Sequence, residues 1–392
     1  MDVIVAHPSL NRGGGAEKVC LTTVRTLVKK GYRVTLATVD KTDWPFLRER
    51  FGEISSPNKE FYLLEKMTVK GKFSQAALTL ACYLPELFFL KMKAEHEVLV
   101  NTYGDLVDSI ADISYINAVP LRVAHHYPES GFSSSAVWRT ITQGYGFSLN
   151  VADRIFVNNI LLANSKFTQH VMKKHLRRHS KVVYPPVDTQ KFRLLTAKKA
   201  KRENLVAVVS RLRLGKRLEL VPKIARLARK GRFVILGLAD EASQDAIDSL
   251  TRTIKSLGVE DRVELLVNRS FRELAGVLAS AKVFLSSQRL EAFGIAVVES
   301  MASGCVPVVP RDGGPWFDIL DQNQGKYGYS YRTIEEAAKE IQMLLTNEEL
   351  RAGISSRACV RAMDFDISVF EDEISCIVEL VSSGKASQSL SK

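Results

Sequence analysis

The sequence predicts an α/β protein with two doubly wound parallel sheets, each in its own domain. Three stretches carry this prediction. Residues 3–38 read as strand, loop, helix and strand, and the same rhythm restarts at 205–209. Residues 283–309 repeat it with an apolar strand, a polar loop, a helix and a second strand. Short apolar runs that alternate with helical periods are typical of parallel sheets.

The length of 392 residues suits two domains of ordinary size, and 46% hydrophobic residues supply a core for each. Residues 185–203 form the best boundary, because they contain two prolines and a basic cluster but no periodic apolar pattern. We therefore expect domains at 1–186 and 204–365, with last helices at about 366–381.

The elements follow from apolar runs and from helix-ending glycines such as Gly31, Gly231 and Gly304. In the first half, we expect strands at 3–6, 34–38, 98–101, 113–116, 122–124, 155–157, 161–163 and 181–184, and helices at 16–30, 73–90 and from Asn164 on. In the second half, we expect strands at 205–209, 233–236, 263–266, 283–285 and 306–309, and helices at 217–230 and 295–303. Residues 40–72 give no clear pattern.

The net charge of +12 indicates an anionic partner. No RNA-binding or helix-turn-helix pattern is present, so a membrane surface is a better candidate than nucleic acid. The apolar helix at 73–90 contains Pro85 and Glu86, which favours a buried or interfacial helix over a membrane span. A solvated basic face remains the alternative.

The five cysteines are odd in number and widely spaced, which predicts neither a disulfide framework nor a metal site. Their pattern favours a reducing compartment. The first ten residues read as a strand rather than a signal peptide. We therefore expect a cytoplasmic protein, peripheral on the cytoplasmic face of a membrane.

Two carboxylates, Glu291 and Glu299, lie where a strand's carboxyl end meets a helix amino end, which is where such sheets bind ligands. A carboxylate accepts two hydrogen bonds and suits vicinal hydroxyls of a sugar or ribose. The N–H groups of Phe293, Gly294 and Ile295 begin the helix and favour an anionic group. A solvated helix face accounts for Glu299 equally well at this stage, and an ordinary N-terminal helix acid for Glu291.

Arg211 and Lys216 flank the loop after the second half's first strand, where two cations suit a diphosphate. Surface cations are the alternative interpretation. Near the start, three successive glycines, 13–15, allow a backbone to approach a phosphate or sugar closely. A flexible turn explains them as well. No Asp-x-Asp metal motif follows a strand in the usual context.

His125 and His126 follow the predicted strand at 122–124 and are candidates to face a substrate. Adjacent strand residues point to opposite sides, so only one of them is expected to do so. A structural or surface histidine is the alternative for each.

These motifs together resemble the retaining nucleotide-sugar glycosyltransferases of family 4, which have the GT-B fold of two Rossmann-like domains facing a cleft. The matching features are Glu291, seven residues and Glu299 with Phe-Gly-Ile between them, Ser-Arg-Leu and Gly-Lys at 210–216, Tyr-Pro-Pro at 184–186 and Gly-Gly-Pro at 313–315. The His-Tyr-Pro at 126–128 resembles the eukaryotic and archaeal α1,2-mannosyltransferases of lipid-linked oligosaccharide assembly. The segment at 115–120 matches the same motif with Asn117 in place of histidine.

The resemblance implies a role for each candidate residue. Glu299 is expected to hold the ribose, and Glu291 with the N–H groups of 293–295 the sugar. Arg211 and Lys216 are expected to hold the diphosphate, with Gly14 and Gly15 closing over it, and His126 is expected to lie at the reacting centre. The final helices are expected to cross back to the first domain.

The resemblance also implies the reaction: transfer of a hexose, with GDP-mannose as the preferred donor, to a lipid-linked or membrane-held glycan. Neither a metal nor another cofactor is expected. Three alternatives stay open: a soluble relative that uses a UDP-sugar and a small acceptor, a nucleotide-sugar 2-epimerase, and a non-catalytic binding module of the same fold.

Overall fold

The computed structural model describes residues 1–52, 54–66, 72–93, 97–127, 146, 151, 155, 159–196, 202–240 and 243–383. Its contacts divide the chain into two compact units. The first unit comprises Met1–Pro128, Ser133–Pro186 and Ser368–Lys392, and the second comprises Glu129–Phe132 and Val187–Ile367. The change from one unit to the other at Pro186 lies within the segment expected to be the boundary.

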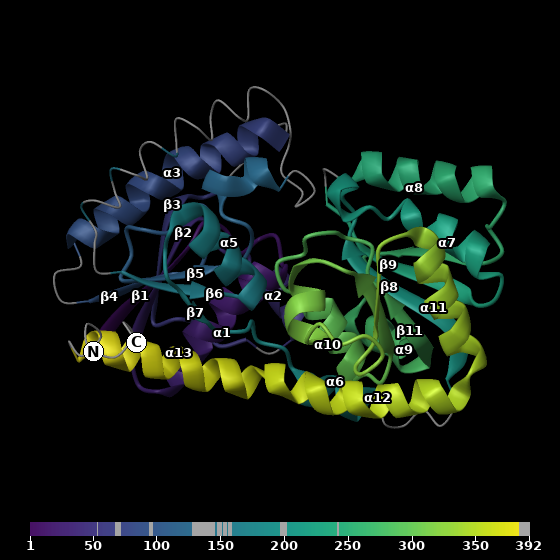
Figure 1. Cartoon of the computed structure of the whole chain (residues 1–392). Helices are drawn as coiled ribbons and strands as arrows, with labels where there is room; N and C mark the ends of the chain where they lie inside the picture. The colour runs from purple at the N-terminus through teal and green to yellow at the C-terminus, as the bar shows by residue number, and fades with distance from the viewer. Residues whose placement is uncertain are drawn as a thin grey trace. The chain divides into compact units, whose positions relative to one another are not determined.

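The first unit is built on a seven-stranded parallel sheet in the order β3-β2-β1-β4-β5-β6-β7 (Figure 1). Its strands are β1 (Asp2–His7), β2 (Arg33–Asp40), β3 (Lys59–Leu64), β4 (Val98–Asn101), β5 (Ile113–Ile116), β6 (Ile160–Ala163) and β7 (Lys181–Val182). Its helices are α1 (Gly15–Lys29), α2 (Trp44–Phe51), α3 (Lys72–Lys93), the 3₁₀ helix η1 (Leu121–His126), α5 (Lys166–Leu176) and α13 (Ile367–Ser382).

Both faces of this sheet are buried, which explains why its central strands are continuously apolar. On β1, Val3 and Val5 belong to a cluster with residues of α1 and α13. Ile4 and Ala6 alternate with them and belong to a second cluster with residues of α3. The last helix, α13, thus packs in the first unit, where Phe370 contacts Tyr115 edge to face at 5.9 Å.

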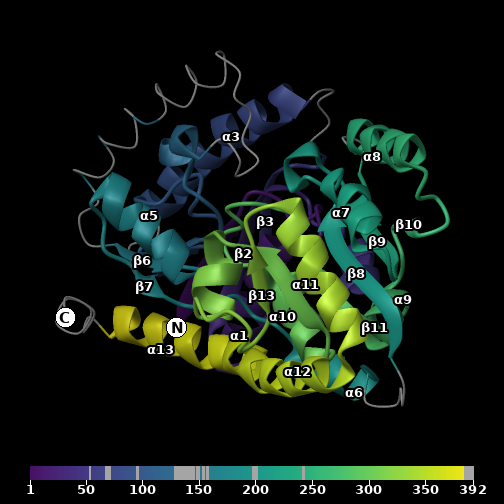
Figure 2. The same cartoon turned by 45° about the vertical axis from the view of Figure 1, so that its right-hand side comes forward.

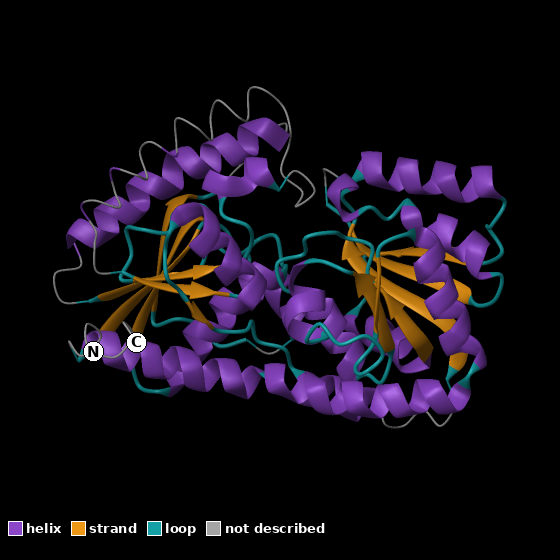
Figure 3. Ribbon diagram, in the orientation of Figure 1, coloured by secondary structure: helices purple, strands orange, loops and turns teal. Residues whose placement is uncertain are grey.

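The second unit holds a six-stranded parallel sheet in the order β10-β9-β8-β11-β12-β13 (Figures 2 and 3). Its strands are β8 (Glu203–Arg211), β9 (Arg232–Leu238), β10 (Val263–Val267), β11 (Ala281–Leu285), β12 (Val306–Pro310) and β13 (Tyr329–Tyr331). Its helices are α6 (Thr189–Thr196), η3 (Leu214–Lys216), α7 (Leu220–Ala228), α8 (Gln244–Leu257), α9 (Phe271–Ser280), α10 (Ile295–Ala302), η4 (Pro315–Ile319), α11 (Ile334–Thr346), α12 (Glu348–Ala362) and η5 (Met363–Phe365). The two parallel sheets confirm the predicted fold class.

Several element predictions were wrong or incomplete. Residues 122–124 lie in η1 rather than a strand, because the chain turns after Pro120 and closes 3₁₀ bonds such as Val123 N–H to the Pro120 carbonyl, 2.9 Å. Of the strand expected at 155–157, only Ile155 is described, and it is helical. The helix expected from Arg217 begins at Leu220, since Arg217 is left-handed with φ 54°. The sequence did not reveal α2, α6, α11, α12, β3 or β13.

Among the described residues, no helix combines the length and the apolar character that a bilayer crossing needs.

Candidate active site

An ion pair joins two predicted site residues at the carboxyl edge of the second sheet. Lys216 ends the short helix η3 that follows β8, and its Nζ lies 3.0 Å from Glu291 Oε2. Gln288 Oε1 is a second acceptor for the same ammonium group. The Ser287 hydroxyl donates to the Lys216 carbonyl at 2.8 Å, so the loop after β11 holds both ends of this lysine.

Glu291 is held in place by the backbone of the loop that follows β12. The Gly314 N–H donates to the Glu291 carbonyl at 2.8 Å. A Cβ at Gly313 would lie 2.5 Å from that carbonyl oxygen, and a Cβ at Gly314 would lie 2.3 Å from the Ala292 oxygen. Only glycine permits this approach, so the Gly-Gly-Pro motif has a steric reason in this fold.

Asp312 supports the same loop with its side chain. Its Oδ1 accepts the N–H of Leu290 at 2.7 Å, and its Oδ2 accepts Arg289 Nε at 2.7 Å. Leu290 has φ 52°, an unfavourable conformation for a leucine, and the bond from Asp312 holds it there. Gln288, Ser287 and Asp312 were not identified from the sequence, because their partners are distant in the chain. The Asp-Gly-Gly turn itself was the available signal.

The other predicted donor residues lie at the same sheet edge. Arg211 is the last residue of β8, and its side chain is exposed. Glu299 is half-buried, one turn into α10. That helix begins at Ile295 after Gly294, which has φ 101°. In its first turn, the Val297 N–H donates to the Gly294 carbonyl at 2.9 Å, and the positive end of the helix favours an anionic group. Phe293 is buried and packs edge to face on Phe365 at 5.4 Å.

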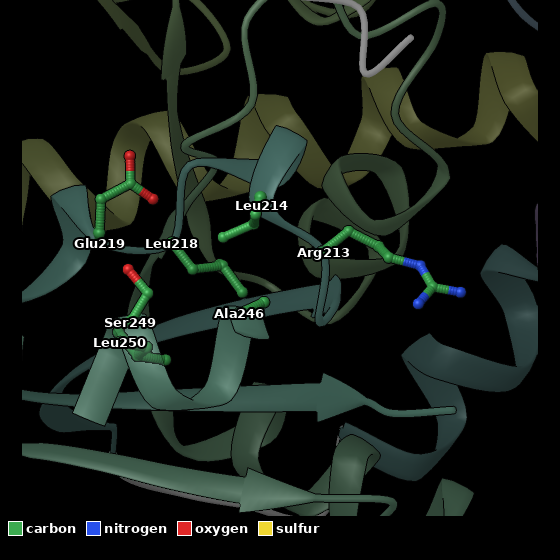
Figure 4. Close-up of a pocket in the computed structure, with 7 residues that line it drawn as sticks. All are labelled: Arg213, Leu214, Leu218, Glu219, Ala246, Ser249 and Leu250. Atoms are coloured by element: carbon green, nitrogen blue, oxygen red, sulfur yellow. The ribbon is translucent and has the colours of Figure 1, made fainter. Parts of the chain in front are cut away.

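A small pocket near this loop contains none of the predicted donor residues (Figure 4). Its lining comes from η3 and the residues flanking it, and from α8: Arg213, Leu214, Leu218, Glu219, Ala246, Ser249 and Leu250. The Arg213 guanidinium points away from the other side chains in the close-up and pairs with Asp240. The pocket is therefore not part of the predicted donor site.

In the first unit, the glycine turn leads directly into α1. Gly15 is already the first residue of the helix, and Gly14 is its N-cap. Glu17 Oε2 accepts the Gly14 N–H at 2.7 Å, so that N–H has a protein partner. The other oxygen, Glu17 Oε1, lies 3.9 Å from Nε2 of the fully buried His7. His7 Nδ1 is 2.9 Å from the Thr102 hydroxyl, which donates to the Ala6 carbonyl at 2.9 Å.

The three candidates for the residue at the reacting centre lie in different local settings. His126 is exposed at the end of η1, and its ring stacks on His175 at 4.6 Å. His125 lies in the same 3₁₀ helix, so the argument from strand alternation does not apply to the pair. Asn117 directly follows β5, at the sheet edge, and its Nδ2 donates to the Thr102 carbonyl at 2.5 Å. The geometry therefore places Asn117, rather than either histidine, at a strand end.

Asp105 adds a buried carboxyl group beside Asn117 that the sequence did not reveal. It is 5% exposed, and burial raises the pKa of its carboxyl group to about 7. Hydrogen bonds from the N–H groups of Asp105 and Asn117 lower this pKa but do not offset the effect of burial. Its Oδ1 has no hydrogen-bond partner among the described residues. A carboxyl group that titrates near neutrality at a sheet edge is a candidate functional residue.

Known proteins resemble this chain in sequence and in fold. Residues 193–360 match the family model described as glycosyl transferases group 1. The chain is 24% identical to human GDP-Man:Man(3)GlcNAc(2)-PP-Dol alpha-1,2-mannosyltransferase, over 95% of this chain and 85% of that protein. It is 23% identical to the Dictyostelium discoideum protein of the same name, over 94% and 82%.

Solved structures give the same fold assignment. The Anabaena protein HepE, in complex with UDP and glucose, superposes with a TM-score of 0.71 at 20% identity, covering 98% of this chain and all of that one. WaaG, a glycosyltransferase involved in lipopolysaccharide biosynthesis, superposes with a TM-score of 0.67 at 14% identity, covering 96% and 99%. The architecture is that of the GT-B glycosyltransferases.

The chain is therefore a glycosyltransferase of the GT-B fold. More narrowly, it carries a glycosyl transferases group 1 domain, which begins within α6 and includes Lys216, Glu291 and Glu299.

Proposed function

We propose that this enzyme transfers mannose from GDP-mannose to a lipid-linked glycan, with retention of anomeric configuration and without a metal ion. The observation that carries the proposal is the contact between Lys216 and Glu291 at the carboxyl edge of the second sheet. It joins a cation suited to a diphosphate and a carboxylate suited to sugar hydroxyls. The names of the relatives that align over most of this chain support mannose and a dolichol-linked acceptor.

In this proposal, each donor group has a residue at the second sheet's edge. Glu299 accepts hydrogen bonds from the ribose hydroxyls. Glu291 and the N–H groups at the start of α10 bind the sugar. Lys216 and Arg211 bind the diphosphate and stabilise the charge that develops on it as the glycosidic bond breaks. Fixed cations can do this without a metal ion. From the first unit, Gly14 and Gly15 are proposed to close over the donor, and Asn117 replaces His126 as the residue facing the reacting centre.

A lipid-linked acceptor requires the enzyme to work at a membrane surface, and one face of the first unit supports such a role. Phe88, Phe89 and Met92 on α3 are 47%, 56% and 65% exposed. Tyr83 and Leu87 on the same helix are fully buried against the sheet, so the three exposed side chains lie off the packed face. Together with the net charge of +12, this favours peripheral binding to an anionic membrane.

The transfer reaction is tested with purified protein, GDP-mannose and a dolichyl-diphosphate oligosaccharide. We expect a product one hexose heavier by mass spectrometry, an α-linkage by NMR, and the same rate in EDTA. UDP-glucose and UDP-N-acetylglucosamine serve as competing donors. Conversion of the nucleotide sugar without acceptor would instead identify an epimerase, and binding without turnover would identify a non-catalytic module.

The membrane role is tested separately by co-sedimentation with phosphatidylserine vesicles. Replacing Phe88, Phe89 and Met92 together by serine is expected to abolish binding. Val360 and Met363, exposed in the second unit, provide the matched control when both are replaced by serine. Equal vesicle binding by the α3 variant and wild type would contradict the role of α3.

A further inference from the structure

The ammonium group of Lys216 has two acceptors from one loop, and they differ in charge. Glu291 Oε2 is 3.0 Å from Nζ, and Gln288 Oε1 also accepts from it. Glu291 cancels the charge of Lys216, whereas the amide of Gln288 leaves it unchanged. Without a ligand, Lys216 and Glu291 therefore form a pair with no net charge, and the uncharged amide of Gln288 is the third group in the cluster.

This arrangement has a consequence for the binding of a diphosphate, which rests on the proposed function above. A phosphate binds a lysine more weakly when a carboxylate neutralises it. Glu291 must therefore leave Lys216 as it turns to the sugar hydroxyls. At that moment Gln288 is the described side chain that still contacts the ammonium group.

Gln288 is rigidly placed for this purpose. It is 9% exposed, and it lies three residues after the end of β11. The preceding residues are fixed to the sheet edge, because the Ser286 N–H donates to the Val308 carbonyl at 3.0 Å and the Tyr331 hydroxyl donates to the Ser286 carbonyl at 2.7 Å. Ser287 adds its bond to the Lys216 carbonyl. A lysine on a flexible four-carbon stem loses much side-chain entropy when it is ordered, and a preplaced acceptor reduces that loss on binding.

We propose that Gln288 is a positioning residue for Lys216. Its uncharged amide oxygen keeps the ammonium group directed at the donor phosphates when Glu291 leaves Lys216 and binds the sugar hydroxyls. Gln288 itself need not touch the donor. Its effect should therefore be confined to ligands that carry phosphate and should vanish when Lys216 is absent.

The proposal is tested by isothermal titration of GDP and guanosine, with UDP and uridine as a second pair. Gln288→Leu removes the acceptor and is expected to weaken diphosphate binding about 3- to 10-fold. Gln288→Glu places a second carboxylate on the ammonium group and is expected to weaken it more, by at least 10-fold at low salt. Nucleoside binding should not change in either variant. Gln244→Leu, the same change at an exposed position on α8, is the matched control and is expected to bind like wild type.

A double-mutant cycle separates positioning from a general structural effect. In a Lys216→Ala background, Gln288→Leu is expected to change diphosphate binding less than 2-fold, because the group that it positions is gone. Additive losses, equal losses for nucleoside and diphosphate, or unchanged binding by both Gln288 variants would overturn the proposal. If wild type binds neither GDP nor UDP, the proposed function itself fails, which is a different result from unchanged binding by the variants. Circular dichroism confirms that each variant is folded.

Discussion

The carboxyl edges of the two sheets differ in how their polar side chains are paired. At the carboxyl edge of the second sheet, Lys216 pairs with Glu291 and Arg289 pairs with Asp312. At the equivalent edge of the first sheet, His7 Nε2 and Asp105 Oδ1 are buried and have no hydrogen-bond partner among the described residues. Buried polar groups are normally paired, and leaving one unpaired costs about 1–3 kcal/mol.

The comparison teaches that the two sites are stabilised in different ways. The second unit's site is preorganised by its own ion pairs and by glycine backbones packed against Glu291. The first unit instead buries polar atoms that have no hydrogen-bond partner among the described residues: those of His7 and Asp105 at its sheet edge, and those of Glu86 in α3. Changes to the ion pairs of the second unit should therefore affect activity most, and changes to the carboxyl group buried in α3 should be seen largely in stability and its dependence on pH.

The largest effect is expected from Lys216→Ala. The substitution removes the cation proposed to stabilise the leaving diphosphate, and losing such a group typically lowers kcat by about 100- to 1,000-fold. Steady-state transfer from GDP-mannose measures it. Lys223→Ala, an exposed lysine on α7, is the control and should retain wild-type kcat. Arg211→Ala is expected to lower turnover as well, and unchanged turnover would remove Arg211 from the diphosphate site.

Gly314→Ala tests whether the second unit's site depends on backbone packing. The new Cβ would lie 2.3 Å from the Ala292 oxygen, so the loop that carries Glu291 must shift. We expect a stability loss of about 1–3 kcal/mol, as for other overpacked sites. Nucleotide-sugar binding should fall at the same time, and chemical denaturation with titration of GDP-mannose measures both. Full stability with unchanged binding would show that this packing does not position Glu291.

Glu86→Gln tests the unpaired carboxyl group in the first unit. Glu86 is 3% exposed, both its oxygens lack partners among the described residues, and burial raises its pKa to about 8. The folded state then keeps a proton that the unfolded chain loses above its ordinary value of 4.5. Stability should therefore fall as the pH rises from about 4.5 to 8.

Glu86→Gln cannot titrate at this position, so the loss of stability that Glu86 causes between about pH 4.5 and 8 is absent from the variant. The variant should match wild type near pH 4.5 and exceed it at pH 8 by up to about 4 kcal/mol, at about 1.4 kcal/mol per pKa unit. Denaturation across this pH range measures the difference, with Glu49→Gln on the exposed face of α2 as the control. Parallel pH profiles for wild type and Glu86→Gln would mean that Glu86 has a partner when folded.

The smallest effects are expected at two helix caps, one in each unit. Ser165 is buried and accepts the Thr168 N–H at 3.0 Å, whereas Thr333 is exposed and accepts the Glu336 N–H at 3.3 Å. Replacing either by alanine should lower stability by roughly 0.5–2 kcal/mol, with the larger loss at Ser165. Denaturant unfolding measures both. A larger loss at Thr333 would contradict the ranking by burial.

The fold and the donor motif could be predicted because both depend on residues that are close together in the sequence. The strand, glycine turn and helix around Glu291 need only neighbouring residues to be recognised, and α10 begins at Ile295 as expected. Gln288 could not be identified in this way, since its contact with Lys216 joins residues 72 positions apart. Asp312 and Leu290 are also distant in the sequence, 22 positions apart, so their contact could not be predicted either.

The first unit was harder to predict because its elements lack such local signals. The edge strand β3 alternates between exposed and half-buried residues, so its apolar side chains did not stand out. The run at 122–124 predicts a strand, but so short a run just after a proline fits a 3₁₀ helix equally well. Burial of Asp105 and Glu86 follows from tertiary packing, which no local pattern records.

The assignment of Glu291 to the sugar and Lys216 to the diphosphate is tested most directly by titrating wild type and Glu291→Gln with GDP and GDP-mannose. The substitution frees Lys216 from a neutralising carboxylate and weakens the grip on the sugar hydroxyls. We predict that GDP binds Glu291→Gln as tightly as wild type or more tightly, while the ratio of the GDP-mannose Kd to the GDP Kd rises at least 10-fold. An unchanged ratio, or an equal loss of affinity for both ligands, would contradict it.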